Sequence, residues 1–392
     1  MNQASQQARM IADESGWLQY HSVGRFPGQR DAIGAAMSEF ADMWLSLDDR
    51  RWTLAGEKRR RAIELWAKLV GGTPSSIFTV ENVTLAFSAF IESLPTSALA
   101  GRTVLIAADC FPSLHFLMAE LAARMDFRLK TVPIAPGNFY VTDDEFVDAW
   151  GEDVALAMIN WVSSVSSKRV DLDRLAAHGK AMGSLIALDI TQGVGILPIE
   201  LAGLNVDFAA STSLKWLCGV PGTGFAYIRP DLLRTLNPRT HGWQSQPDPT
   251  SWDLGRFTLA PDARRFNNGT GSTLPYFASL PGLEWVAAQG IQTLAAHNRR
   301  LCHRLIEIVD HHGFTLASPR DDAQRGGSVM IAMPSAAAAD ALRRQLLSCG
   351  FNCDARSERL RWSPGAVTTI EALDTLDRAL ETIGAESLAR SA

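Results

Sequence analysis

Residues 188–227 read LDITQGVGILPIELAGLNVDFAASTSLKWLCGVPGTGFAY and decide the fold. The apolar run at 184–190 predicts a buried strand that ends near the carboxylate of Asp189, and residues 206–210 predict a second strand. Lys215 follows this second strand, 26 residues after Asp189, and precedes a glycine-rich turn at 219–224. A lysine can form a Schiff base with a cofactor, and a carboxylate can pair with a ring nitrogen. The stretch therefore predicts a site for a charged aromatic cofactor.

The rest of the chain predicts an α/β fold. Strand patterns at 77–80, 103–108, 129–134 and 155–161 alternate with helical patterns, which favours a mostly parallel sheet with helices on both faces. Ligands of such sheets bind beyond the carboxyl ends of the strands, so we expect Asp189, the loop at 109–113 and Lys215 to meet there. We divide the chain into an N-terminal arm (1–30), a large domain (31–280) and a small C-terminal α/β domain (281–392), with a long helix at 280–309 between the last two.

Composition excludes several classes of protein. The 392 residues are 46% hydrophobic, which is ample for a large core. The net charge is −5, and the only basic run, KRRR at 58–61, is expected to form the solvated face of a helix, so a nucleic-acid partner is not expected. The first 15 residues have no apolar core, so no signal peptide is expected, and no apolar run reaches membrane-spanning length. The five cysteines have neither metal-site nor disulfide spacing. We therefore expect a reduced, cytoplasmic protein without a metal or a membrane partner.

The central stretch resembles a known family. Asp189, Gln192 and Lys215 resemble the D-x-x-Q…K pattern of the pyridoxal phosphate (PLP) enzymes of fold type I, class V aminotransferase group. Residues 189–195 (DITQGVG), 206–209 (VDFA) and 214–222 (LKWLCGVPG) are similar, in the same order, to three segments of kynureninases. The resemblance extends more weakly from about residue 15 to about residue 375. It implies pyridoxal 5'-phosphate as cofactor, a mostly parallel large domain and a small C-terminal domain.

The resemblance also implies roles around the cofactor ring. Lys215 would form the Schiff base and later act as general base, Asp189 would keep the ring nitrogen protonated, and Gln192 would bond the phenolic oxygen. Phe111, in the segment FPS at 111–113, would stack on the ring. Taken without these patterns, Lys215 has an ordinary explanation as a surface lysine and Phe111 as a core residue.

Five further residues are implied at the cofactor phosphate. Val83 and Thr84 open a predicted helix, whose first N–H groups suit an anion. The other implied phosphate-binding residues are Thr212, Trp243 and Thr270. In the family the residue that matches Thr270 comes from the neighbouring subunit, so the resemblance implies a homodimer with shared active sites.

Further residues bear on substrate recognition and on the type of reaction. Arg361 resembles the family arginine that grips the substrate α-carboxylate, and Arg356 is its competitor. Gln192, Leu114 and Leu214 stand where kynureninases have histidine, aspartate and tyrosine, so the chain departs from true kynureninases. Cys353 does not lie in the loop that carries the nucleophile of cysteine desulfurases, which disfavours that reaction.

These observations predict an enzyme that acts on an amino acid. The first hypothesis is a kynureninase-like side-chain lyase that cleaves a C–C or C–S bond at Cβ, and the runner-up is a class V aminotransferase, because both reactions use the same residues. A non-catalytic protein of the PLP fold is a weaker alternative. A nucleotide-binding Rossmann protein is weaker too, since the G-x-G-x-x-G pattern between an early strand and helix is missing.

Overall fold

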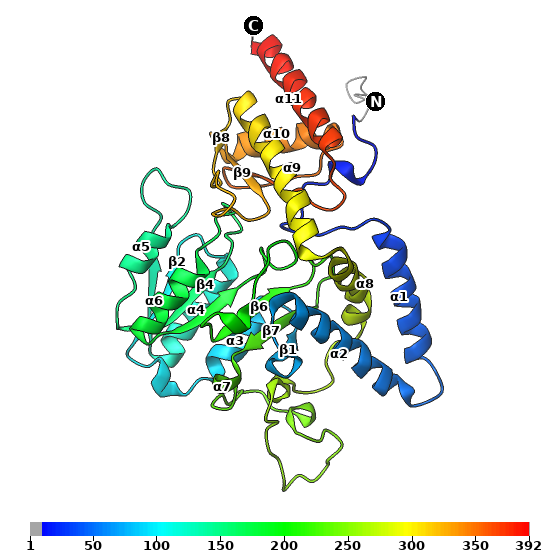
Figure 1. Ribbon diagram of the computed structural model, residues 1–392, viewed down its shortest axis with the longest axis vertical. Helices are drawn as coiled ribbons and strands as arrows, with labels where there is room; N and C mark the ends of the chain where they lie inside the picture. Colours follow the sequence, from blue (N-terminus) through cyan, green and yellow to red (C-terminus); the bar gives the residue numbers. More distant parts are fainter. Residues whose placement is uncertain (1–9, 392) are drawn as a thin grey trace.

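The computed structural model describes residues 10–391 and is built around a seven-stranded sheet with the order β1-β7-β6-β5-β4-β2-β3 (Figure 1). Within this sheet β7 runs antiparallel to both of its neighbours, and the other strands are parallel to one another. The strands are β1 (Ile77–Val80), β2 (Thr103–Ala107), β3 (Arg128–Val132), β4 (Val154–Asn160), β5 (Leu185–Asp189), β6 (Phe208–Thr212) and β7 (Gly224–Ile228). The predicted mostly parallel α/β architecture is confirmed.

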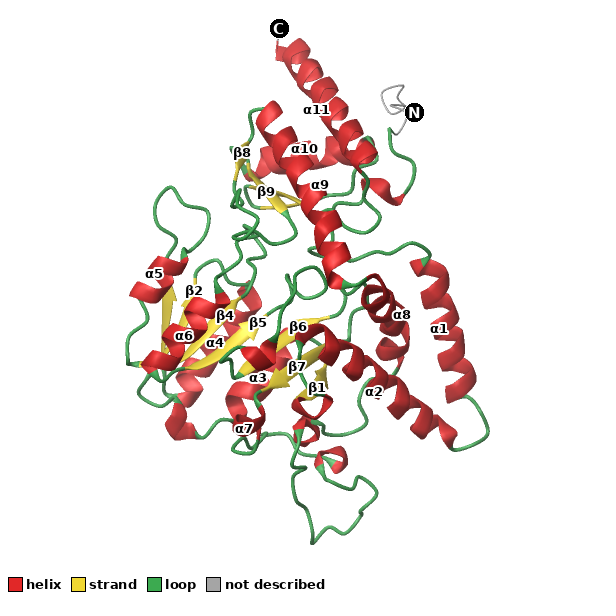
Figure 2. Ribbon diagram, in the orientation of Figure 1, coloured by secondary structure: helices red, strands yellow, loops and turns green. Residues whose placement is uncertain are grey.

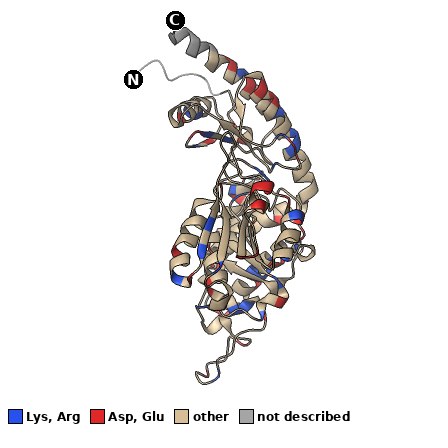
Figure 3. Ribbon diagram, turned by 90° about the vertical axis from the view of Figure 1, so that its left-hand side faces the viewer, with Lys and Arg blue, Asp and Glu red and all other residues tan. Residues whose placement is uncertain are grey.

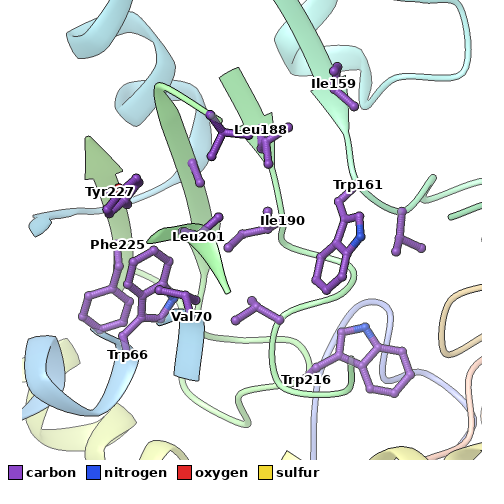
Figure 4. Packing of buried hydrophobic residues seen from close by; sticks show 14 of the residues in the cluster. Trp66, Val70, Ile159, Trp161, Leu188, Ile190, Leu201, Trp216, Phe225 and Tyr227 are labelled. Carbon is purple, nitrogen blue, oxygen red and sulfur yellow. The ribbon is translucent and has the colours of Figure 1, made fainter. Parts of the chain in front are cut away.

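Helices cover both faces of this sheet (Figure 2). One face packs against α3 (Val83–Ser93), α4 (Pro112–Met125) and α7 (Pro230–Leu233). The other face packs against α2 (Arg50–Val70), α5 (Asp143–Asp148), α6 (Leu172–Met182) and α8 (Leu274–Gln289). In Figure 4, Trp66 and Val70 of α2 lie against Phe225 and Tyr227 of β7 in this second cluster. Because the central strands are buried on both faces, their sequences read as continuous apolar runs.

A second, four-stranded sheet has the order β10-β11-β9-β8, and its neighbouring strands are antiparallel. It consists of β8 (Thr315–Leu316), β9 (Val329–Ala332), β10 (Asp354–Arg356) and β11 (Arg359–Trp362), with the helices α9 (Ile291–His311), α10 (Ala336–Ser348) and α11 (Ile370–Ser391). Figure 1 shows α9 running from the level of the large sheet to that of the small one. Between α1 (Gln29–Trp44) and the chain start, the segment around Leu18 pairs with this sheet through single bridges, and Leu18 is buried in its apolar cluster.

Three details differ from the sequence predictions. The helix expected at 280–309 is two helices, because Gly290 has a φ of +78° and separates α8 from α9. The strand expected at 206–210 is β6 and begins two residues later, at Phe208. The KRRR run is only partly solvated: Arg60 and Arg61 form surface ion pairs, but the Arg59 guanidinium binds three protein oxygens.

Acidic and basic residues are interspersed along the ribbon in Figure 3. Among the helices of residues 10–391, none combines the length and the apolar character that crossing a membrane requires.

Candidate active site

A cavity of about 700 Å³ lies beside the carboxyl ends of β5 and β6. It brings together seven of the ten residues predicted to form the site, which are Val83, Thr84, Phe111, Asp189, Gln192, Thr212 and Lys215. Leu114 and Leu214, the two apolar departures from the kynureninase pattern, also line it. The position at strand ends follows the general rule for ligands of open α/β sheets.

Asp189 is the last residue of β5, and its carboxylate is buried and held on both oxygens. The backbone N–H of Thr191 donates to Oδ1 at 2.9 Å, and Asn160 Nδ2 donates to Oδ2 at 3.0 Å. Burial raises the pKa of the Asp189 carboxyl, and the hydrogen bonds from Thr191 act against that rise. Each carboxylate oxygen keeps a further lone pair, so Asp189 can still accept a hydrogen bond from a protonated ring nitrogen.

Asn160 was missed by the sequence analysis. It ends β4, which is parallel to β5, and the register places Asn160 directly beside Asp189. The pair could have been predicted from the sequence, because Asn160 and Asp189 are polar residues that each end a buried strand. The carboxyl ends of parallel strands lie at the same edge of the sheet.

Lys215 lies in the tight turn that follows β6. Its backbone is enclosed: the N–H of Cys218 donates to Lys215 O at 2.9 Å, and the N–H of Gly24 donates to Leu214 O at 2.9 Å. Burial lowers the pKa of the Lys215 amine to about 8, the nearby Asp189 carboxylate opposes this, and Arg361 adds to it. The amine lies 5.4 Å from the centroid of the Phe111 ring. An amine in an enclosed site whose pKa is lowered toward neutral pH suits both Schiff-base formation and proton transfer.

Gln192 follows Asp189 on the same turn and is fixed at both ends of its amide. Nε2 donates to the backbone oxygen of His21 at 3.0 Å, and Trp216 Nε1 donates to Oε1 at 3.3 Å. The second Nε2 hydrogen remains for a ligand. The structure therefore holds Gln192 against the cavity through the N-terminal segment.

The opposite end of the cavity is suited to an anion. Val83 and Thr84 form the first turn of α3, whose preceding residue Asn82 accepts the N–H of Leu85 at 3.0 Å. The first N–H groups of a helix have no partner within it and carry the positive end of the helix dipole. Thr212, at the end of β6, completes this side.

Trp243 and Thr270 are not brought to the cavity of their own chain. The Trp243 side chain is 42% exposed, and Thr270 is exposed in the turn at 268–271. This turn lines a separate cavity of about 300 Å³, which shares Glu81, Leu85 and Gly222 with the first. The resemblance implies that both residues lie near a phosphate, Thr270 across a subunit boundary, and this stays a prediction.

Arg361 lies just behind the cavity wall rather than on it. It is buried on β11, and its Nη1 donates at 2.9 Å to the backbone oxygen of Ser164, which does line the cavity. Its Nε and Nη2 bond both oxygens of Asp354, the residue opposite on β10, at 2.6 and 2.5 Å. The competitor, Arg356, has an exposed side chain.

Asp354 and His21 form a second pair that the sequence analysis missed. Although burial would raise it, the pKa of Asp354 is held below its usual value by hydrogen bonds from His21 and Arg361. His21 Nε2 lies 3.2 Å from Asp354 Oδ1, and burial lowers the pKa of the imidazole to about 4, so His21 is neutral at pH 7. The two residues are far apart in sequence, and no local pattern joins them.

This set of residues fits pyridoxal 5'-phosphate. A buried carboxylate, an amine with a lowered pKa, an aromatic ring and a helix N-terminus surround one cavity, and each matches a different part of that cofactor.

The chain belongs to the aminotransferase class V family, which matches residues 49–346. Its cofactor is accordingly pyridoxal 5'-phosphate, as predicted, and the protein is a PLP-dependent enzyme of class V. The alternative of a nucleotide-binding Rossmann protein is therefore wrong.

Similar proteins include enzymes with different reactions. An isopenicillin N epimerase of Streptomyces clavuligerus is 28% identical over 341 residues, covering 83% of this chain and 84% of the epimerase. A kynureninase of Salinispora tropica is 26% identical over 318 residues, covering 76% and 73%. The solved structure of the cystine C–S lyase C-DES with cysteine persulfide has a TM-score of 0.82 at 19% identity, covering 93% of this chain and 97% of that one. This structural likeness confirms fold type I.

Proposed function

We propose that the enzyme is a kynureninase-like lyase that cleaves a C–C or C–S bond at Cβ of an amino-acid substrate. The observation that carries the proposal is the Lys215 amine, whose pKa of about 8 and position in one cavity with Asp189 suit it to move a proton at Cα. The kynureninase relative supports the lyase outcome.

The residues around the cavity have different tasks in this proposal. Bound PLP supplies an electron sink for negative charge at the substrate Cα. Asp189 would hold the proton on the ring nitrogen, and Phe111 would pack against the ring. Lys215 would hold the cofactor through its amine, and the same amine would act as the base at the substrate Cα. The N-terminus of α3 and Thr212 hold the phosphate.

Arg361 anchors the substrate α-carboxylate in this proposal. Of its five N–H groups, two bond Asp354 and one bonds Ser164 O, which leaves one on each terminal nitrogen. These two N–H groups can donate end-on to a carboxylate once the cavity wall at Ser164 moves aside. Arg356 is a poorer candidate because its side chain points into solvent.

The apolar lining supports a substrate other than kynurenine. Leu114 and Leu214 line the cavity and replace an acid and a phenol of the kynureninase pattern, so the cavity wall lacks two polar groups of that pattern. A desulfurase reaction is not proposed, because Cys353 is buried and burial raises the pKa of its thiol to about 12.

Two other outcomes remain as alternatives. A class V aminotransferase would use the same residues. It would differ in that the proton taken from the substrate Cα is returned to a carbon of the cofactor. An epimerase is favoured by the 28% identity to isopenicillin N epimerase over most of both chains. A non-catalytic role is disfavoured because Lys215 and Asp189 face one cavity.

The proposal includes a homodimer with shared active sites. It is supported by Trp243 and Thr270, which are exposed and lie outside the cavity of their own chain. The division at residue 280 and a cytoplasmic location also belong to the proposal. The five cysteines are free and buried, which suits a reducing compartment.

One experiment separates the reactions. The holoenzyme is incubated in D₂O with panels of aryl- and sulfur-bearing L-amino acids, with and without an oxo acid, and the products are identified by NMR and mass spectrometry. A lyase releases a side-chain fragment without the oxo acid, an aminotransferase requires the oxo acid, and an epimerase gives the D-isomer with deuterium at Cα and no fragment. The Lys215→Ala variant is the control. Deuterium exchange or transamination on every substrate, with no fragment from any, would contradict the lyase proposal.

A further inference from the structure

Arg59 differs from its neighbours in the KRRR run. Arg60 pairs with Glu64 and Arg61 with Glu284 at the surface of α2. Arg59 instead donates from Nε to Thr79 Oγ1 at 2.8 Å, from Nη1 to Gln244 Oε1 at 3.1 Å and from Nη2 to Asn267 Oδ1 at 2.6 Å. Its acceptors are thus a hydroxyl and two amide oxygens.

The charge of Arg59 is not balanced locally. Among the residues that the structure describes, no carboxylate lies within ion-pair distance of its guanidinium, and burial lowers its pKa. Arg59 lines the cavity of about 300 Å³, together with two acids. Of these, Glu81 accepts a hydrogen bond from Ser272, and Glu92 forms an ion pair with Arg124. Placing a cation among neutral partners is costly unless the geometry it fixes, or an anion it meets, offsets the cost.

The two amides that Arg59 binds belong to one packed unit. Gln244 lies in the short helix Trp243–Ser245, and Asn267 immediately precedes the turn at 268–271 that carries Thr270. The N–H of Gln244 donates to Asn268 O at 3.0 Å. Gly242 allows this contact, because a Cβ there would lie 2.3 Å from Asn268 O. Arg59 therefore ties the unit that presents Trp243 and Thr270 to α2 and, through Thr79, to β1.

We propose that Arg59 is a positioning residue for the cofactor site of the partner subunit. It holds Trp243 and Thr270 in the arrangement in which they meet the phosphate of the cofactor bound there, and its unbalanced positive charge favours that dianion. The inference rests on the proposed homodimer with shared sites. Arg59 itself would not touch the cofactor, and it lies on α2 rather than on the segments that carry Trp243 and Thr270.

The first test measures cofactor affinity by fluorescence titration. Arg59→Met keeps the aliphatic stem and removes all donors, so we expect the Kd for PLP to rise about tenfold or more. Arg59→Lys keeps the charge without the fork and should recover only part of the affinity. Arg60→Met is the matched control, since its partner Glu64 is on the surface, and it should leave the Kd unchanged.

The second test locates the defect by subunit mixing. When Arg59→Met subunits are mixed with Lys215→Ala subunits, one site of each hybrid receives a native Lys215 from the first chain and native Trp243 and Thr270 from the second. Up to half of the sites in hybrids should therefore regain turnover and cofactor affinity. Asp189→Asn mixed with Lys215→Ala is the negative control, because each defect lies in the site of its own chain. Thr270→Ala mixed with Lys215→Ala tests the shared site itself.

The outcomes distinguish this inference from the proposed function. Native affinity and turnover in Arg59→Met would overturn the inference. So would recovery by Thr270→Ala hybrids but not by Arg59→Met hybrids. If verified Thr270→Ala hybrids do not recover, the shared site is wrong and the inference with it. Should Arg59→Met fail to fold, Asn267→Ala removes an acceptor instead and must show the same recovery in hybrids.

Discussion

At the scale of single residues, the site depends on how two buried charges are held. Asp189 is buried where its charged form is disfavoured, and Asn160 and Thr191 supply the hydrogen bonds that offset part of this cost. Lys215 is affected in the same way, and its lowered pKa places the neutral amine within reach near pH 7. Burial thus makes Lys215 an effective base, while the hydrogen-bond donors Asn160 and Thr191 help to keep Asp189 an anion.

We expect Asp189→Asn to fold normally and to lose at least about 100-fold in turnover, which corresponds to about 2.7 kcal/mol of transition-state stabilisation. The amide is nearly isosteric, but it cannot hold a proton on a ring nitrogen. Asn160→Leu should give a smaller loss in the same direction, because it removes one donor to Asp189 Oδ2. Steady-state kinetics and thermal unfolding check both variants. Native turnover in Asp189→Asn would assign Asp189 a structural role only.

The pKa of Lys215 predicts a dependence of apoprotein stability on pH. In the folded state this pKa is about 8, below its usual value of 10.5, so between these values the unfolded chain binds more protons and stability rises with pH. Below pH 8 both states are protonated, and the cost of the buried cation is fully present. Lys215→Met should therefore stabilise the apoprotein at pH 7 by at most about 3 kcal/mol, and the gain should disappear by about pH 10.5. Urea unfolding across this range measures the difference, and a gain independent of pH would contradict the assignment.

At the scale of elements, the N-terminal segment shapes the site although it forms no strand of the large sheet. Gly24 contacts the Lys215 turn so closely that a Cβ would lie 1.8 Å from Lys215 O. His21, three residues earlier, binds Gln192 through its backbone and Asp354 through its ring. The segment therefore links the cavity to the strand pair that carries Arg361.

Gly24→Ala tests this link. The added methyl group must displace either the segment or the Lys215 turn, so we expect a loss of about 1–3 kcal/mol in stability and a fall in turnover. Gly34→Ala is the control, because no atom lies within 4 Å of the new Cβ in α1 and alanine favours a helix by about 0.5–1 kcal/mol. Unfolding curves and kinetics of both variants measure the contrast. Native activity in Gly24→Ala would show that the turn does not depend on this contact.

The elements also show what the sequence could predict. Strand β1 begins and ends where expected, because its apolar pattern is unbroken and Asn82 caps the helix α3 that follows it. The break at Gly290 was missed because an apolar helical pattern continues on both sides of it.

Some contacts of the candidate site could likewise be predicted from the sequence, and others could not. Asp189, Lys215 and the start of α3 were predictable, since each follows a strand and the carboxyl ends of parallel strands meet. The contacts of His21, Asp354 and Arg59 were not, because they join segments far apart in the chain and depend on how those segments pack. Arg59 was even expected in solvent, since a run of four basic residues usually is.

At the scale of the whole molecule, one chain leaves large apolar side chains uncovered. The loop at 246–259 extends from the body at the bottom of Figure 1, and in it Trp252 is 86% and Leu254 99% exposed. Exposed apolar patches of this kind often mark interaction surfaces. Together with the exposed Trp243 and Thr270, they support a second copy of the chain as the covering partner.

We therefore expect a homodimer whose activity depends on association. On serial dilution, turnover per subunit should fall in step with the dimer fraction measured by mass photometry, because the monomer lacks the partner's Trp243 and Thr270 at its phosphate site. Excess PLP should restore part of the activity at intermediate dilution by binding the dimer preferentially. The Lys215–cofactor bond, trapped with borohydride, provides the control: it should still form in monomers at high PLP, since Lys215 and Asp189 belong to one chain. Full turnover in a verified monomer would contradict the shared site, whereas loss of lysine labelling in monomers would place more of the cofactor site across the boundary than the structure of one chain indicates.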